Sequence, residues 1–477
     1  MSRTAFAVAI MLLVASCKKT STSDPNSHPA AGDVALNFSV DVNKPGRLIP
    51  LGFTGLSYEA GAIPNPAYFS DSNTTFVNLI KELGQGVFRI GGNTVDRSPW
   101  VAVASSGVNL DKVITDQDLD RLFKFTGATG WKVMFGLNLG TGTPRYAALE
   151  AAYIYSHYPD QLFSFEIGNE PDFYGNNGLR PIGYSNTDFE KDFTVFYDSI
   201  RGRTPEAVFS GPTTATHTMT WLEPFVRDEA SHIQMVTQHY YKMGPASSPA
   251  VTIEKLLDGN SGIISQAETM KAVADVYHLP YRIAECNSVF GGGKGGVSNT
   301  LASALWGLDL MFVLAEHGAA GVNFHHGGKD TDWYNPIEFY QGQFIPKPLY
   351  YGMLLFSKAA DGNLLSVSAD TLRQSEAFNL VVHAVKRQNG AVLVTLINKD
   401  LSRQAFVTLT IHHPGWQSAS LLRLTGGSPA DTSVMLGGAA VDAEGHWTPQ
   451  QVENATLTKN GCTVKMPPYS AALLVLQ

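Results

Sequence analysis

From residue 51 to residue 360, short apolar runs alternate with longer stretches whose apolar residues recur at helical spacing. Each short run is typical of a buried strand and is followed by enough chain for a helix. The eight runs are residues 53–57, 86–90, 132–137, 163–167, 207–210, 235–240, 281–285 and 321–324. Eight consecutive strand–helix repeats predict an α/β fold, the (β/α)8 TIM barrel.

The pattern changes to all-β in residues 361–477, where short alternating strands are separated by turn residues. Gln388-Asn389-Gly390 is a strong hairpin signal between two of these strands. The expected strands are residues 378–385, 391–397, 405–412, 418–424 and 470–476. We therefore expect a C-terminal β-sandwich domain, which the alternating strand in residues 34–50 would join from the other end of the chain.

The N-terminus has the features of an export signal. Residues 1–17 contain an early Arg, an apolar stretch and a small-residue end, and the apolar stretch is too short to span a bilayer. Val14-Ala15-Ser16-Cys17 resembles the lipobox of bacterial lipoproteins, which implies acylation of Cys17. Residues 18–33 are polar and predict a flexible tether. We expect a bacterial cell-envelope protein that contacts the membrane only through its lipid anchor, with an ordinary signal peptide as the alternative.

Charge and cysteine content exclude several classes of function. The 477-residue chain has a formal net charge of -8 and no basic run, so it would repel a phosphate backbone and nucleic acid is not expected as a partner. Besides Cys17, the chain has Cys286 and Cys462, whose spacing indicates neither a disulfide framework nor a metal site. We expect no cofactor.

Two of the predicted barrel strands end in carboxylates. The fourth runs into Asn169-Glu170-Pro171, and the seventh ends in Ala284-Glu285. The carboxyl ends of barrel strands meet at one mouth, so Glu170 and Glu285 should face each other. Glycosidic bond cleavage needs two such groups, and a separation of about 5 to 5.5 Å would indicate retention of configuration.

Several further motifs, taken together with this pair of carboxylates, resemble those of a known protein family. They are Gly55-Leu56-Ser57-Tyr58-Glu59, Arg89-Ile90-Gly91-Gly92-Asn93, Asn169-Glu170-Pro171, His239-Tyr240-Tyr241, Ala284-Glu285 and Gly291-Gly292-Gly293. With these motifs the chain resembles the heparanase and β-glucuronidase family of retaining glycoside hydrolases. The resemblance implies that Glu170 is the general acid/base and Glu285 the nucleophile. The negative charge of Glu285 would help to raise the pKa of Glu170, which must start the reaction protonated.

The resemblance also implies a set of sugar-binding residues. It assigns the sugar 2-hydroxyl to Asn169, contact with the nucleophile to Tyr240, the uronate carboxylate to Gly291, Gly292 and Tyr334, and other hydroxyls to Glu59 and Asp96. The glycines could instead form a mobile turn, and the two acids could be ordinary loop carboxylates. Phe290 stands where the resemblance leads us to expect a tyrosine, so one donor to the uronate is missing.

Other reactive residues have structural explanations. Glu166 lies four residues before Glu170, so alternation puts it on the same face but deeper in the barrel. Cys286 should point outward from the barrel as a buried thiol. His239, His325 and His326 lack a recurring ligand spacing, and we expect no metal.

The preferred hypothesis is an exo-acting β-glucuronidase that releases glucuronic acid from oligo- or polysaccharides by double displacement. An endo-acting enzyme of the heparanase type is an alternative, although it would need a basic cleft that this acidic chain does not suggest. Phe290 leaves open an exo-glycosidase for a neutral sugar. A non-catalytic glycan-binding lipoprotein is the alternative from another class, and the sandwich is expected to be a scaffold rather than a separate carbohydrate-binding module.

Overall fold

The computed structural model describes residues 33–101, 113–327, 332–369, 378–411, 415–458 and 460–477. The predicted signal peptide, Cys17 and all but the last residue of the predicted tether lie outside the described residues. Among the helices in the described ranges, none combines the length and the apolar character that a membrane crossing requires.

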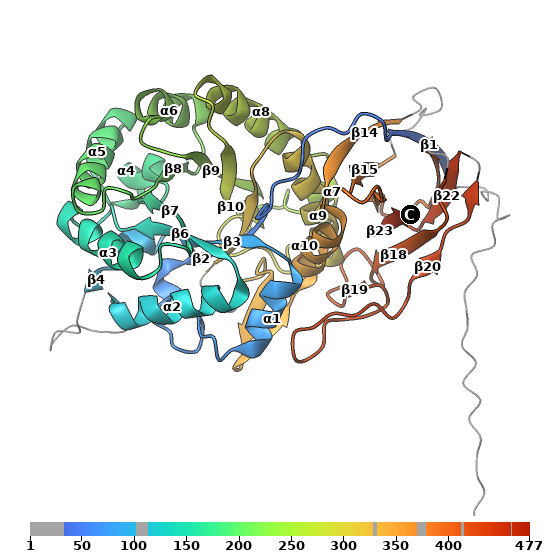
Figure 1. The fold of residues 1–477 in the computed structure, drawn as a ribbon, viewed down its shortest axis with the longest axis horizontal. Coiled ribbons are helices and arrows are strands. Elements are labelled where there is room, and N and C mark those ends of the chain that lie inside the picture. Colours follow the sequence, from blue (N-terminus) through green and yellow to red (C-terminus); the bar gives the residue numbers. More distant parts are fainter. Residues whose placement is uncertain (1–32, 102–112, 328–331, 370–377, 412–414, 459) are drawn as a thin grey trace, which may run out of the picture.

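Eight parallel strands form a nearly closed barrel, and together with the second domain they confirm the predicted fold class (Figure 1). Their order around the barrel is β7-β6-β3-β2-β11-β10-β9-β8. A bridge between Phe165 and Phe209 brings β7 and β8 together at the remaining gap. The strands are β2 (Thr54–Glu59), β3 (Gly86–Gly91), β6 (Lys132–Leu137), β7 (Leu162–Ile167), β8 (Ser210–Thr214), β9 (Met235–Met243), β10 (Tyr281–Val289) and β11 (Val322–His326).

Helices follow the barrel strands and cover the outside of the barrel (Figure 1). Two of them start with a capping box, in which Thr115 or Ser185 exchanges hydrogen bonds with the Asp three residues later. The helices are α1 (Thr74–Glu82), α2 (Asp116–Thr129), α3 (Pro144–His157), α4 (Tyr174–Asn177), α5 (Asn186–Arg203), α6 (Glu223–Glu229), α7 (Ile253–Leu257), α8 (Ser261–Val276), α9 (Leu301–Glu316) and α10 (Pro348–Ala359).

The fifth barrel strand lies further along the chain than predicted. The expected run was residues 207–210, whereas β8 begins at Ser210 and ends at Thr214. This strand contains glycine, proline and threonines instead of large apolar residues, so hydrophobicity does not reveal it. Its polar residues are buried because they face the polar centre of the barrel, where Thr213 Oγ1 accepts a hydrogen bond from Arg89.

The second domain is a large mixed sheet that curls around one core, as expected for the predicted sandwich. Figure 1 shows blue β1 lying among the orange and red strands from the other end of the chain. β1 runs antiparallel to β14 and parallel to β17. The larger strands are β1 (Val34–Asp41), β14 (Asn363–Ala369), β15 (Leu380–Lys386), β16 (Val392–Asn398), β17 (Ala405–Ile411), β18 (Ala419–Thr425), β22 (Gly461–Met466) and β23 (Ser470–Leu476).

Shorter strands complete the described structure. β19 (Met435–Leu436), β20 (Glu453–Asn454) and β21 (Leu457–Thr458) extend the sheet of the second domain. The pairs β4 (Trp100–Val101) with β5 (Ile114–Thr115) and β12 (Ile337–Tyr340) with β13 (Gln343–Pro346) form two small separate sheets.

A buried ionic cluster joins the two domains through α9. Asp309 accepts hydrogen bonds from Lys399 Nζ at 2.6 Å and from Asn260 Nδ2 at 2.8 Å. His383 bridges the Asp309 and Glu316 carboxylates, at 3.1 Å from Nε2 and 2.7 Å from Nδ1. Asp309, His383 and Lys399 are buried, whereas Glu316 is partly exposed to water. Loss of one buried partner would therefore leave another buried charge uncompensated.

His383 should make the stability of this interface depend on pH. Burial lowers the pKa of His383, but the Glu316 and Asp309 carboxylates outweigh burial and raise it from 6.5 to about 9. The stabilisation is therefore complete below pH 6.5 and is lost as the pH rises through about 9, an effect of up to about 3 kcal/mol. We expect the urea midpoint to fall over this range in the parent and much less in His383→Gln. Exposed His157→Gln is the control, and equal pH slopes in parent and His383→Gln would contradict the prediction.

Candidate active site

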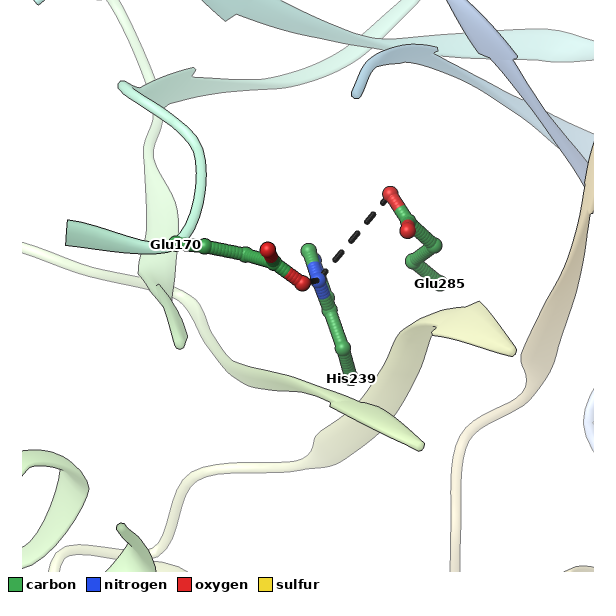
Figure 2. Close-up of side chains that lie close together, drawn as sticks. All are labelled: Glu170, His239 and Glu285. Atoms are coloured by element: carbon green, nitrogen blue, oxygen red, sulfur yellow. Dashed lines mark hydrogen bonds and ion pairs between the residues drawn. The ribbon is translucent and has the colours of Figure 1, made fainter. Parts of the chain in front are cut away.

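The two predicted catalytic carboxylates face each other at the carboxyl ends of their strands. Figure 2 shows Glu170, which follows β7, beside His239 and opposite Glu285 of β10. One carboxylate oxygen of each Glu and one ring nitrogen of His239 lie within 4.8 Å of one another. Both carboxylates line a cavity of about 600 Å³. The structure therefore brings this predicted pair together.

Glu170 lies in an environment that keeps its carboxyl group protonated. Its backbone has φ 51° and ψ 55° and is held by a hydrogen bond from its N–H to the Thr213 carbonyl. Burial raises the pKa of Glu170 well above the usual value, and the nearby charges of Glu285 and Asp172 raise it further. A raised pKa is what a general acid requires.

His239 fixes the orientation of the Glu170 side chain. Burial lowers the pKa of His239 to about 4, so the ring is neutral near pH 7. Its Nε2 lies 3.0 Å from Thr213 Oγ1, which already accepts a hydrogen bond from Arg89 and can donate its own proton to the ring. Nδ1 then carries the ring proton and donates to Glu170 Oε1 at 2.9 Å. The acidic proton of Glu170 is left on its other oxygen, Oε2.

Glu285 is held ionised at the opposite side of the cavity. Arg89 Nη1 donates to its Oε2 at 2.7 Å, and the Tyr241 hydroxyl donates to its Oε1 at 2.8 Å. Burial opposes ionisation, but the surrounding positive charge and the Tyr241 hydrogen bond outweigh it and bring the pKa of Glu285 well below its usual range. Since His239 is neutral near pH 7, His325 and Arg89 supply that charge. This state suits a nucleophile.

Arg89 is the central residue that the sequence reasoning missed. Its guanidinium is fully buried and also contacts Glu166 Oε2 at 2.7 Å and Asn169 Oδ1 at 2.8 Å. Glu166 accepts a second hydrogen bond from Thr237, which confirms its predicted structural role. Arg89 was visible only as part of a motif on the second barrel strand. One ligand atom from each of Glu170, Glu285 and His239 lies within 4.8 Å of the other two, a spacing that could also hold a divalent metal. Arg89 already supplies a positive charge to Glu285 at 2.7 Å.

Comparisons with known proteins agree with this geometry. No protein-family model matches the chain. It is 25% identical over 389 residues to a β-glucuronidase of Aspergillus niger, covering 73% of this chain and 69% of that protein. A β-glucuronidase of Neurospora crassa is 24% identical over 67% of this chain and 65% of its own length, and heparanase of Bos taurus is 23% identical over 76% and 75%.

The fold is shared with solved glycoside hydrolases. A 4-O-α-L-rhamnosyl-β-D-glucuronidase from Fusarium oxysporum has a TM-score of 0.76 at 22% identity, with 93% of this chain and all of that chain covered. An arabinofuranosidase from Xanthomonas axonopodis pv. citri has a TM-score of 0.70 at 18% identity over 93% of this chain and all of its own. Over most of its length the chain is similar to β-glucuronidases and heparanases. It is a glycoside hydrolase, as the paired carboxylates predicted.

Tyr240 of this hydrolase does not contact the nucleophile, and this prediction was wrong. Along β9, the side chains of Thr237, His239 and Tyr241 point into the barrel and contact Glu166, Glu170 and Glu285 in turn. Tyr240 lies on the other face of the strand, with its hydroxyl close to Gly262 of α8. Strand alternation therefore gives the predicted role to the following residue, Tyr241.

The two neighbouring tyrosines allow a matched test. In Tyr241→Phe, Glu285 loses a hydrogen bond to a charged group, and we expect kcat to fall roughly 10- to 100-fold from a loss of about 1.5 to 3 kcal/mol. Tyr240→Phe should change kcat less than about twofold, since its hydroxyl is outside the site. Initial rates on an aryl glycoside measure both. Similar losses in the two variants would argue against the contact with Glu285.

Asp96 was also assigned incorrectly. The hydrolase cavity is not lined by Asp96, whose carboxylate is buried and accepts hydrogen bonds from the backbone N–H groups of Gly140 and Asn169. It therefore holds the backbone just before Glu170 rather than a sugar hydroxyl. The Asn169 side chain is 2% exposed and is oriented by Arg89, and its contact with a sugar stays a prediction.

The remaining predicted binding residues do line the cavity. They are Glu59, Gly291, Gly292 and Tyr334. Gly291 and Gly292 have φ values of 78° and 96°, which side chains other than glycine rarely adopt. The Trp333 N–H donates to the Gly292 carbonyl at 2.6 Å, so this turn is bonded to the segment that carries Tyr334. The other lining residues are Asn93, Phe173, Ala215, Thr216, Tyr241, Phe290, His325, Gly327 and Asp332.

Proposed function

We propose that the protein is a retaining, exo-acting β-glucuronidase. The observation that carries the retaining mechanism is the approach of Glu170 and Glu285, with an oxygen of each within 4.8 Å of the other. Retaining enzymes hold their carboxyl groups about 5 to 5.5 Å apart, whereas inverting enzymes leave about 6.5 to 9.5 Å for a water molecule. The spacing here favours direct attack by Glu285 on the anomeric carbon.

The reaction then proceeds in two steps. Glu170 transfers its proton from Oε2 to the glycosidic oxygen while Glu285 forms a bond to the anomeric carbon and the aglycone leaves. The ester at Glu285 carries no negative charge, so one cause of the raised pKa of Glu170 disappears. Glu170 can then accept a proton from water, which attacks the anomeric carbon and releases the sugar.

Support for a glucuronide substrate comes from relatives and from the cavity. Two of the sequence relatives are β-glucuronidases, and the structural neighbour from Fusarium oxysporum acts on a rhamnosylated glucuronide. Gly291, Gly292 and Tyr334, the residues expected to bind the uronate carboxylate, line the cavity together. Phe290 lines the same region and contributes no hydroxyl. This favours a neutral-sugar exo-glycosidase as the second candidate.

Exo-action is supported by the size and charge of the cavity. A volume of about 600 Å³ suits one or two sugar rings rather than a long polymer. The lining residues that the structure describes include no Lys or Arg, which a sulfated polymer would require. Phe173 and Ala215 line the cavity together with Glu170. Since Glu170 protonates the leaving group, these apolar side chains favour an uncharged aglycone.

A panel of aryl glycosides tests this proposal. We expect kcat/KM for the β-glucuronide to exceed that for the β-glucoside, β-galactoside and β-xyloside by about 10²-fold or more, because polar groups built for a carboxylate are left unpaired by the other sugars. Preference for a neutral sugar would overturn the uronate assignment, and cleavage of none would favour a glycan-binding protein. Proton NMR of the first product should show the β-anomer. The α-anomer would refute retention.

The cellular site is a separate part of the proposal. The lipobox at residues 14–17 supports a protein anchored by lipid in the bacterial envelope. In a bacterial host fed a labelled fatty acid, the parent chain should acquire label and Cys17→Ser should not. Equal labelling of the two chains would contradict the anchor.

A further inference from the structure

His325 of β11, which supplies positive charge beside Glu285, lies between two carboxylates of the cavity. Its Nδ1 is 3.6 Å from Glu285 Oε2, and its Nε2 is 3.7 Å from Glu59 Oε1. Ser57 Oγ lies 3.0 Å from Nδ1 and accepts a hydrogen bond from Arg89 Nη1 at 3.2 Å, and its second lone pair can accept the Nδ1 proton. The ring is 3% exposed and lines the cavity. Each ring nitrogen therefore faces a carboxylate, an arrangement that suits a ring with a proton on both nitrogens.

The charged groups around His325 determine which carboxylate it can pair with. Arg89, which also contacts Glu285, forms its ion pairs with Glu166 and Glu285. Glu59 accepts hydrogen bonds from Thr94 N–H and Oγ1, at 2.7 and 2.5 Å, and from the Asn93 N–H. These hydrogen bonds fix the orientation of the Glu59 side chain toward His325. Within the described residues, His325 is the only cationic group that forms an ion pair with Glu59.

The other titratable groups near this ring do not replace it. His326, the next residue, bonds to the Tyr68 hydroxyl and has its pKa lowered to about 3 by burial. His239 contacts Glu285 at 3.9 Å but is also neutral near pH 7. Tyr334 packs edge-on against His325. Burial lowers the pKa of His325, but Glu285 and Glu59 outweigh burial and Arg89, so the net pKa is raised.

We propose that His325 is a positioning residue whose imidazolium bridges Glu59 and Glu285, keeps the nucleophile ionised and couples sugar binding at Glu59 to its reactivity. This inference rests on the proposed function, because it requires Glu285 to act as the nucleophile. When Glu285 is esterified it loses its charge, and the imidazolium then has Glu59 as its remaining anionic partner.

The test compares substitutions that keep or remove the charge. His325→Gln removes it, His325→Lys restores a cation, and His326→Gln is a matched control on the same strand. If His325→Gln is not recovered folded, His325→Asn serves as the neutral variant. The readout is the pH dependence of inactivation by 2-deoxy-2-fluoro-β-glucuronosyl fluoride, with the labelled residue identified by mass spectrometry. This reagent isolates the first step, in which ionised Glu285 attacks.

Loss of a nearby positive charge raises the pKa of a carboxyl group. In His325→Gln, the acidic limb of the inactivation profile should therefore move upward by at least about one pH unit. His325→Lys should return the limb toward the parent position, and His326→Gln should leave it in place.

Two results would overturn the bridge. One is that His325→Gln is inactivated more slowly than the parent while the acidic limb of its pH profile stays in place, which would indicate a steric role. The other is a Lys variant that behaves like the Gln variant. Absence of label at Glu285 in the parent protein would instead contradict the proposed function. Failure of the His325 bridge and failure of the proposed function are therefore distinguishable.

Discussion

Glu285→Gln should lower kcat/KM by at least about 10⁴-fold, because the amide cannot form the glycosyl ester on which double displacement depends. The substitution keeps the size of the side chain and one oxygen for Arg89 or Tyr241. It removes the negative charge that Arg89 contacts at 2.7 Å. The loss should therefore appear mainly in kcat, since the chemistry fails while most sugar contacts remain.

Glu206→Gln is the matched control for this variant, because Glu206 is an exposed carboxylate outside the cavity. It should retain full activity. Thermal unfolding should be followed in parallel, since an uncompensated Arg89 destabilises the barrel centre. An inactive Glu285→Gln that also binds no substrate analogue would indicate misfolding, and a variant with more than about a tenth of the parent kcat/KM would refute the nucleophile assignment.

Glu170→Gln should lose about 10² to 10⁴-fold in kcat on substrates with poor leaving groups, the usual contribution of general acid catalysis. An activated aryl leaving group departs without a proton, so its first step should be much less affected. Hydrolysis of the ester still needs a base, and the intermediate should accumulate. The expected signature is a burst of phenol followed by slow turnover.

Stopped-flow kinetics on substrates of graded leaving-group pKa provides the measurement. The slope of log kcat/KM against leaving-group pKa should steepen in Glu170→Gln relative to the parent. Azide, which needs no base, should accelerate the slow phase and form a β-glycosyl azide. Equal losses on good and poor leaving groups would show that Glu170 does not supply the proton.

The fold and the approach of Glu170 to Glu285 could be predicted because both depend on short sequence patterns. Seven of the eight barrel strands overlap their predicted ranges along most of their length. Glu170 and Glu285 follow from strand position alone, since the barrel collects strand ends at one mouth. The fifth strand was misplaced because Gly211, Pro212 and the following threonines do not form an apolar run.

The finer contacts of the site depend on side-chain direction, which motifs do not encode. The assignment of Tyr240 followed the motif and ignored alternation, although inward-facing His239 implies inward-facing Tyr241. Asp96 has the right residue type near a strand end, but it turns toward the backbone of Gly140. Arg89 contacts Glu166 and Glu285 from strands far apart in the sequence, and only the closed barrel brings them together.

The place of β1 has a consequence for how this chain can be divided. Among the described strands of the mixed sheet, β1 alone pairs with both β14 and β17, so its removal would separate these strands into two groups. A fragment beginning at β14 would lack a central strand and expose two unpaired edges, which favours aggregation. The barrel therefore occupies the stretch of chain between two strands, β1 and β14, that pair with each other in the second domain.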